Sequence, residues 1–165
     1  MAGGTKRSTS MEGARPTLVT LALRQFWRAS RGMTLGVRVA AMDRDGKVCL
    51  VRHTYVDGLH FPGGGVERGE TIFVAARKEL LQETGLAAPL PAFRLEHIFL
   101  NRRFPGDHVA LLTVREPRQV GKPDGREIRE VVWVATSSPP DDVTPATGKR
   151  LMEIVDGGPY DDYWT

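Results

Sequence analysis

Three glutamates that follow a run of glycines are the residues of this chain best suited to chemistry. Gly63–Gly65 come first, then Glu70, and Glu79 and Glu83 stand four residues apart in a segment of helical spacing. Carboxylates at that separation share one helix face and repel each other. A divalent cation between them removes the repulsion, and Mg²⁺ commonly takes one or two carboxylates together with substrate phosphates. Because glycine also lets the backbone approach a charged ligand, the stretch predicts a cation site beside a phosphate site.

The full spacing around these residues resembles that of a known family. The sequence reads Gly64-x5-Glu70-x7-Lys78-Glu79-Leu80-x-Gln82-Glu83-x-Gly85-Leu86 over 23 residues, which resembles the Nudix box. The preceding Phe61-Pro62-Gly63-Gly64 and the later Glu127-Ile128-x-Glu130-x-x-Trp133 also look like this family, so the resemblance extends over roughly residues 34–155. It implies an α/β fold of the Nudix type, an α/β/α sandwich with a mixed β-sheet and a catalytic loop-helix. It further implies Mg²⁺- or Mn²⁺-dependent hydrolysis of a nucleoside diphosphate linked to another moiety.

Two positions depart from the family pattern. Lys78 stands where the Nudix box has arginine, and Gln82 stands where it has the first of two adjacent glutamates. Lysine keeps the positive charge but replaces a planar, two-pronged donor with a point donor. Glutamine keeps an oxygen for a metal ion or its water, with one negative charge fewer. We therefore expect the site to retain metal binding with lower affinity, and loss of catalysis stays open.

The resemblance assigns a role to each residue of the box. Glu83 is expected to be the principal metal ligand, with Glu79 as a second ligand and Gln82 as an oxygen donor. Glu70 is expected to brace the helix glutamates through Lys78. In this family the general base often comes from outside the box, so the candidates are Glu127, Glu130 and Glu79 itself.

Substrate contacts are predicted on both sides of the box. The glycine loop, with Gly63, Gly64 and Gly65, is the expected backbone cradle for the substrate. Arg52 precedes this loop, while Arg102 and Arg103 lie in a later polar loop. Arginine binds phosphate and stacks on bases, so these three are candidate substrate-binding residues and are otherwise solvated surface groups.

The elements that must position these residues follow from periodicity and turn chemistry. Alternation predicts a hairpin of strands 33–42 and 47–52 around the turn at residues 43–46. Helical spacing predicts a helix over residues 71–84 that Gly85 ends in the left-handed conformation. Later segments predict strands at 94–100, 108–115 and 128–134 and a second helix at 144–155. This order indicates a mixed sheet with helices packed on it.

Composition limits the class of protein and its organisation. The chain has 165 residues, one cysteine (Cys49) and a net charge of +3, which suits one domain and excludes an internal disulfide. Residues 1–36 carry a net charge of +5 and residues 37–165 a net charge of −2. We therefore predict a disordered basic tail at 1–15, an amphipathic helix at 16–32, a Nudix hydrolase domain at 33–157 and a C-terminal tail at 158–165. No apolar run is long enough to span a bilayer, so a cytoplasmic protein is expected.

Three functions remain open from the sequence. The leading one is a hydrolase acting on a small nucleotide substrate. The second is a catalytically weakened Nudix-fold module that binds a nucleotide or regulates. The third is an RNA-end pyrophosphohydrolase guided by the basic N-terminal segment, which makes nucleic acid a candidate partner. The amphipathic segment at residues 18–27 is a candidate homodimer contact.

Overall fold

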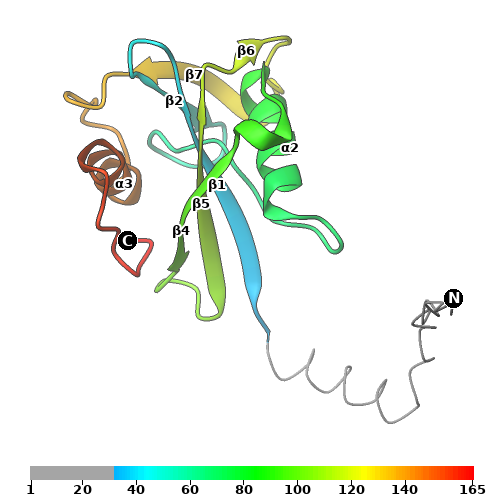
Figure 1. Cartoon of the computed structure of the whole chain (residues 1–165), viewed down its shortest axis with the longest axis vertical. Coiled ribbons are helices and arrows are strands. Elements are labelled where there is room, and N and C mark those ends of the chain that lie inside the picture. The colour runs from blue at the N-terminus through cyan, green and yellow to red at the C-terminus, as the bar shows by residue number, and fades with distance from the viewer. Residues whose placement is uncertain (1–31) are drawn as a thin grey trace, which may run out of the picture. The chain divides into compact units, whose positions relative to one another are not determined.

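The computed structural model describes residues 32–165, and its centre is a five-stranded mixed sheet (Figure 1). The strands are β1 (Thr34–Met42), β2 (Val48–His53), β4 (Arg94–Leu100), β5 (Asp107–Arg115) and β7 (Ile128–Val134), in the spatial order β4-β5-β1-β2-β7. β1 and β5 pair in parallel, and the other neighbours are antiparallel. A small second sheet joins β3 (Leu86–Ala87) to β6 (Arg118–Gln119), and a 3₁₀ turn, η1, covers Leu90–Ala92. The predicted tail at 1–15 and all but the last residue of the predicted helix at 16–32 lie outside the described residues.

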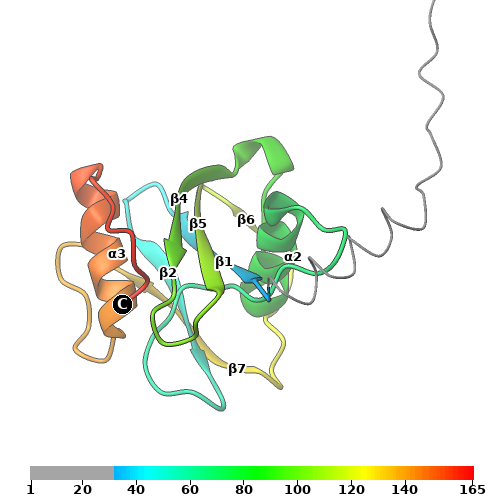
Figure 2. The ribbon, with the colours of Figure 1, turned by 90° about the horizontal axis from the view of Figure 1, so that it is seen from below.

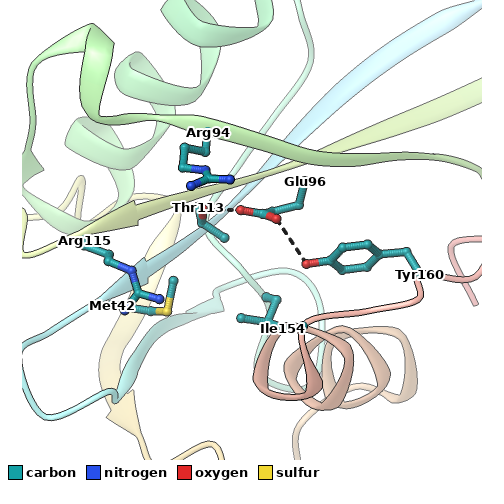
Figure 3. Close-up of a pocket in the computed structure, with 8 residues that line it drawn as sticks. Met42, Arg94, Glu96, Thr113, Arg115, Ile154 and Tyr160 are labelled. Carbon is teal, nitrogen blue, oxygen red and sulfur yellow. Dashed lines mark hydrogen bonds between the residues drawn. The ribbon is translucent and has the colours of Figure 1, made fainter.

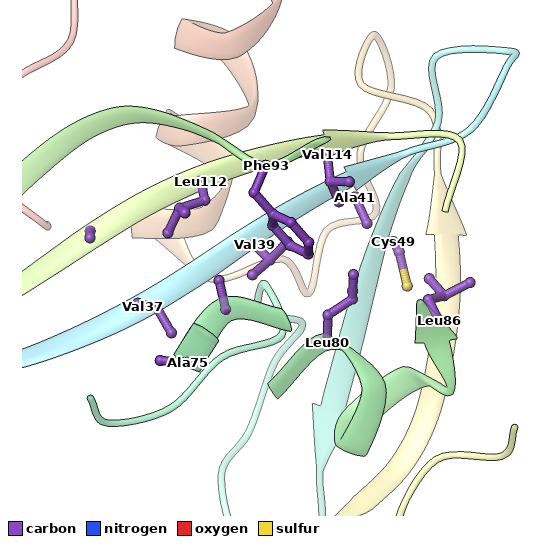
Figure 4. Close-up of a cluster of buried hydrophobic side chains, with 12 residues drawn as sticks. Val37, Val39, Ala41, Cys49, Ala75, Leu80, Leu86, Phe93, Leu112 and Val114 are labelled. Atoms are coloured by element: carbon purple, nitrogen blue, oxygen red, sulfur yellow. The ribbon is translucent and has the colours of Figure 1, made fainter. Parts of the chain in front are cut away.

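Two helices cover opposite faces of the sheet (Figure 2). Helix α2 (Ile72–Thr84) packs over a cluster that includes Val37, Val39 and Cys49 (Figure 4). Helix α3 (Pro145–Asp156) packs over a second cluster on the other face of the same strands, which includes Ala40, Leu50 and Leu151. Successive strand residues point to opposite faces, and consecutive residues such as Val39 and Ala40 are both apolar. Both faces of the sheet are therefore apolar, and each is covered by a helix. The predicted α/β/α sandwich is confirmed.

Both ends of α2 follow from local chemistry. Val74 N donates to the Thr71 hydroxyl at 3.3 Å, which caps the first turn. Gly85 ends the helix at a φ of 72°, where its N–H donates to Leu81 O at 2.9 Å. A Cβ at position 85 would lie 2.4 Å from Gly121 O, so only glycine fits there. The predicted helix over residues 71–84 therefore differs from the observed one only by its capping residue.

The glycine loop takes the place of a neighbouring strand along the first part of β1. Val37 N donates to Gly64 O at 2.8 Å, and Val39 N donates to Pro62 O at 2.9 Å. The chain passes so close that a Cβ on Gly63 would lie 2.0 Å from Val37 O. These backbone bonds hold the loop against the centre of the sheet, where Gly63 and Gly64 lie beside Glu83 and Glu79 of α2.

The residues after α3 pack against the main sheet. Leu100 N donates to Asp162 O at 2.9 Å, and Trp164 N donates to Leu100 O at 3.0 Å. The Trp164 ring lies 5.3 Å from the Phe99 ring. The segment predicted as a C-terminal tail, 158–165, thus covers part of the core on the α3 side. No helix within residues 32–165 is long and apolar enough to cross a membrane.

Candidate functional site

Glu83 is the most buried carboxylate of the predicted site. Its residue is 5% exposed, and Gly63 N donates to its Oε2 at 2.8 Å. Its Oε1 lies 3.8 Å from His53 Nδ1. Burial raises the pKa of Glu83 to about 7, although the Gly63 hydrogen bond and the charge of Arg38 act in the opposite direction. The protein contacts of Glu83 do not by themselves explain why a carboxylate with so high a pKa is buried beside the glycine loop.

Glu79 lies against the next residue of the loop. A Cβ built on Gly64 would lie 2.7 Å from the Glu79 Cδ, so glycine is needed there to leave room for the carboxylate. Burial raises the pKa of Glu79, and the positive charge of Lys78, whose Nζ lies 3.8 Å from Glu79 Oε1, opposes that rise. Gly63 and Gly64 are thus each in contact with one carboxylate of α2, Glu83 and Glu79 respectively.

Lys78 connects Glu79 to the acidic loop before α2. Its Nζ lies 3.2 Å from Glu70 and 3.1 Å from Glu67 Oε1. Glu70 Oε2 also accepts from Glu67 N at 3.1 Å, and this bond, followed by the contact with Lys78, lowers the pKa of Glu70. Glu70, Lys78 and Glu79 are therefore close together, in the arrangement that the bracing role requires. Glu67 is a further partner of Lys78 that the sequence did not single out.

Gln82 and Glu127 stand at the exposed side of the site. The Gln82 side chain is exposed, and its backbone oxygen accepts from Asp124 N at 2.8 Å. This bond fastens the loop before β7 to the end of α2. Glu127 is exposed in that loop, and its negative charge raises the pKa values of both Glu79 and Glu83. Glu127 is thus within electrostatic reach of both helix carboxylates.

A cleft of 580 Å³ opens beside the glycine loop. Its lining residues come from β1, the segment after β2, the glycine loop, the β4–β5 connection and the C-terminal end, and they include Arg38, His53, Tyr55, His60, Gly63, Gly64, Gly65, Arg103, Phe104 and Trp164. The predicted contacts Gly63, Gly64, Gly65 and Arg103 therefore face one space.

The other two predicted arginines do not line this cleft. Arg52 Nε lies 3.0 Å from Glu130 Oε2, and its Nη2 lies 2.6 Å from Asp142 Oδ2. The guanidinium of Arg102 lies 3.4 Å from the centre of the Tyr163 ring. Both side chains are engaged with the protein itself, as is Glu130, the alternative general base.

Arg38 and His53 are two residues of the cleft whose places come from the fold. Arg38 lies on β1 between Val37 and Val39, and its Nη1 donates to Gly63 O at 2.5 Å. The signal for it was present in the sequence, as one charged residue within an apolar strand. His53 has a buried Nδ1 with no hydrogen-bond partner among the described residues, and burial lowers its pKa. The fold places it beside Glu83.

A second, smaller cavity of 220 Å³ lies on the α3 side of the sheet (Figure 3). The Thr113 and Tyr160 hydroxyls both donate to the Glu96 carboxylate, at 2.6 and 3.3 Å, and Arg94 and Arg115 stand nearby. No residue of the glycine loop or of α2 lines this cavity. It is separate from the candidate site.

The two carboxylates that lie against the glycine loop fit a hard divalent cation. Within residues 32–165, no group of three or more His, Cys, Asp or Glu side chains forms a complete metal cage. Glu79 and Glu83 instead offer two carboxylates from one helix face, and both lose hydration by burial. Mg²⁺ is commonly held in this way, by one or two carboxylates with water and substrate phosphates as the remaining ligands. The residues therefore fit Mg²⁺ or Mn²⁺.

Comparisons with known proteins agree with this site and fold. The family model described as NUDIX domain matches residues 32–153. An RNA pyrophosphohydrolase of Xanthomonas oryzae pv. oryzae is 33% identical over 105 residues, which cover 62% of this chain and 46% of that protein. The chain thus spans less than half the length of this curated relative.

Solved structures show the same fold. The MutT NUDIX hydrolase from Burkholderia pseudomallei matches with a TM-score of 0.59 at 21% identity, over 73% of this chain and 97% of that one. A bifunctional NMN adenylyltransferase/ADP ribose pyrophosphatase from Francisella tularensis, complexed with AMP and a Mn ion, matches with a TM-score of 0.64 at 18% identity. This second match covers 83% of this chain and 46% of that one. With the family model covering most of the chain, the protein belongs to the NUDIX domain family.

Proposed function

We propose that this chain hydrolyses a pyrophosphate linkage in a nucleoside diphosphate linked to another moiety, with Mg²⁺ or Mn²⁺ as cofactor. One observation carries the proposal: Glu79 and Glu83 lie against Gly64 and Gly63, and the same glycine loop forms one wall of the cleft. This places a cation-binding pair next to a space large enough for a nucleotide.

The chemistry divides between the cation and the side chains. A bound divalent cation neutralises phosphate charge and lowers the pKa of an attacking water. Glu83 and Glu79 hold the cation, and Lys78 with Glu70 keeps Glu79 in place. Glu127 is the proposed general base, because it is exposed to solvent and within electrostatic reach of both ligands. Gln82 adds a neutral oxygen at the solvent side.

A second candidate substrate is the 5′ end of RNA. The relative from Xanthomonas oryzae carries the name RNA pyrophosphohydrolase and is 33% identical over its matched part. An RNA 5′ end that bears a pyrophosphate linkage offers the same bond to the same site. The guiding role of the basic N-terminal segment and the dimer contact at residues 18–27 remain predictions, because residues 1–31 lie outside the described part of the chain. A cytoplasmic location also remains a prediction.

A substrate screen tests the proposal. The full chain is incubated with Mg²⁺ or Mn²⁺ and with nucleoside diphosphate sugars, dinucleotides, nucleoside triphosphates and capped RNA, and the products are separated by chromatography. We expect cleavage of at least one class of substrate and loss of this cleavage in EDTA. The rate of Glu83→Gln should be reduced at least about 100-fold, because the metal supplies several kcal/mol of transition-state stabilisation.

The matched control is Glu116→Gln, which removes one exposed carboxylate outside the cleft. This variant is expected to keep the rate of the unaltered chain. Absence of turnover on every class with both metals contradicts hydrolysis and favours the nucleotide-binding module.

A further inference from the structure

Arg38 is a cation in the cleft without an acidic partner. Its guanidinium has five N–H donors, and the hydrogen bond to Gly63 O is its one contact of this kind within residues 32–165. No carboxylate oxygen in this part of the chain lies within 4.0 Å of the Arg38 guanidinium. Its remaining donors are free for a ligand in the cleft that Arg38 lines.

The energetics of this position favour an anion. Desolvation by burial lowers the pKa of Arg38, and the more distant charges of Glu83 and Glu79 only partly offset that effect. Arg38 is half-buried, so its guanidinium gives up part of its hydration without a paired anion in return. A planar guanidinium recovers this loss best by charge-assisted hydrogen bonds to phosphate or carboxylate.

The backbone of Gly63 connects Arg38 with Glu83, one of the two proposed metal ligands. Gly63 N donates to Glu83, while Gly63 O accepts from Arg38. The Glu83 carboxylate and the Arg38 guanidinium are therefore bound to two successive peptide groups on either side of the Gly63 Cα, and Arg38 lines the cleft. A diphosphate that reaches from the glutamates into the cleft passes this arginine.

We propose that Arg38 binds a phosphoryl group of the substrate's diphosphate on the cleft side of the glycine loop and so positions the linkage relative to Glu79 and Glu83. The inference rests on the proposed function. Arg103 lines the same cleft but is exposed, so its charge is better hydrated and contributes less. Arg52 and Arg102 are held by other protein groups.

Binding of inorganic pyrophosphate in EDTA, measured by isothermal titration calorimetry on the full chain, tests the inference without catalysis. We expect Arg38→Gln to weaken binding about tenfold or more, as for the loss of charge-assisted hydrogen bonds, and Arg38→Lys to give an intermediate value. The matched control is Arg115→Gln at the last residue of β5, which pairs with Met42 and does not line the cleft, and this variant is expected to bind normally. Undetectable binding by the unaltered chain, or equal binding by folded Arg38→Gln, overturns the inference.

A second measurement does not depend on the folding of the variants. Arginines of the unaltered chain are modified with phenylglyoxal in EDTA, with and without pyrophosphate, and each site is quantified by mass spectrometry. We expect pyrophosphate to protect Arg38 and not Arg115. Equal modification of Arg38 with and without pyrophosphate overturns the inference. Protection of Arg38 in a further sample, which contains adenosine in place of pyrophosphate, also overturns it. Protection of Arg38 in a chain that hydrolyses nothing leaves this inference standing and removes only the proposed function.

Discussion

Among single residues, Glu83 has the clearest consequence for the metal-free protein. Its pKa is about 7 in the folded chain, against an ordinary value of 4.5. Between these values the folded state keeps a proton that the unfolded chain has released. The stabilising effect is therefore fully present below pH 4.5 and is lost as the pH rises through about 7. The expected loss in free energy of unfolding is on the order of 3 kcal/mol, at about 1.36 kcal/mol per pKa unit.

Urea unfolding in EDTA across pH 4–8, on the unaltered chain and on Glu83→Gln, measures this loss. The amide cannot ionise, so the difference in free energy of unfolding between the two proteins should shift in favour of Glu83→Gln as the pH rises. A difference that does not change with pH contradicts the buried, proton-retaining state of Glu83.

Gln82 is the position where one added charge should strengthen the site. Its side chain is exposed on the turn of α2 between Glu79 and Glu83. Gln82→Glu should raise Mg²⁺ affinity at least about fivefold, since even two unit charges about 4 Å apart in water attract by about 1 kcal/mol and Mg²⁺ carries a double charge. Calorimetric titration with Mg²⁺ measures the change. Unchanged or weaker binding indicates that this side chain does not face the cation.

The sequence was informative about site residues wherever local spacing decided their position. Glu79 and Glu83 share a face because they are four residues apart on α2, and Glu70 meets Lys78 because the loop before the helix is short. Arg38 and His53 come from two different strands. A charge within an apolar strand marks Arg38 in the sequence, but only the packing of the two strands against the glycine loop brings Arg38 and His53 to the cleft.

Among the elements, the glycine loop packs between β1 and α2, and substitutions at Gly63 and Gly64 meet different neighbours there. A Cβ on Gly63 meets the backbone oxygen of Val37 at 2.0 Å, which cannot move without disturbing β1. A Cβ on Gly64 meets the end of the Glu79 side chain, which can rotate away.

Alanine substitutions at these two positions should therefore separate fold from site. Gly63→Ala should lower the free energy of unfolding by about 3 kcal/mol or more through overpacking. Gly64→Ala should lower it much less but displace Glu79 and weaken Mn²⁺ binding. Urea unfolding and Mn²⁺ titration of both variants measure the two effects. Equal losses of stability in the two variants contradict this assignment.

The main elements were predictable because each is long and periodic. The strands β1, β4, β5 and β7 and both described helices appear within one or two residues of the expected bounds. β3 and β6 were missed, because two residues each are too few to show a period. The pairing of the glycine loop with β1 was also missed, since glycine has no side chain from which to infer a face.

For the whole molecule, the distribution of charge along the chain says more about function than the net charge does. The net charge of +3 combines a basic segment at residues 1–36 with a body of net charge −2. The body contains the α/β/α sandwich and the cleft, and its NUDIX match covers residues 32–153, close to the predicted domain. Within it, Glu79 and Glu83 of α2 lie against the glycine loop, so the placement of these acids, and not the net charge, supports the proposed cation site.

Mn²⁺ binding to the full chain, followed by the EPR signal of free Mn²⁺, tests the central claim that Glu79 and Glu83 hold the cation beside the glycine loop. We predict saturable binding by the unaltered chain and by Glu116→Gln, and affinities about tenfold or more lower in Glu79→Gln and in Glu83→Gln. Equal Mn²⁺ affinity in all four proteins would contradict it.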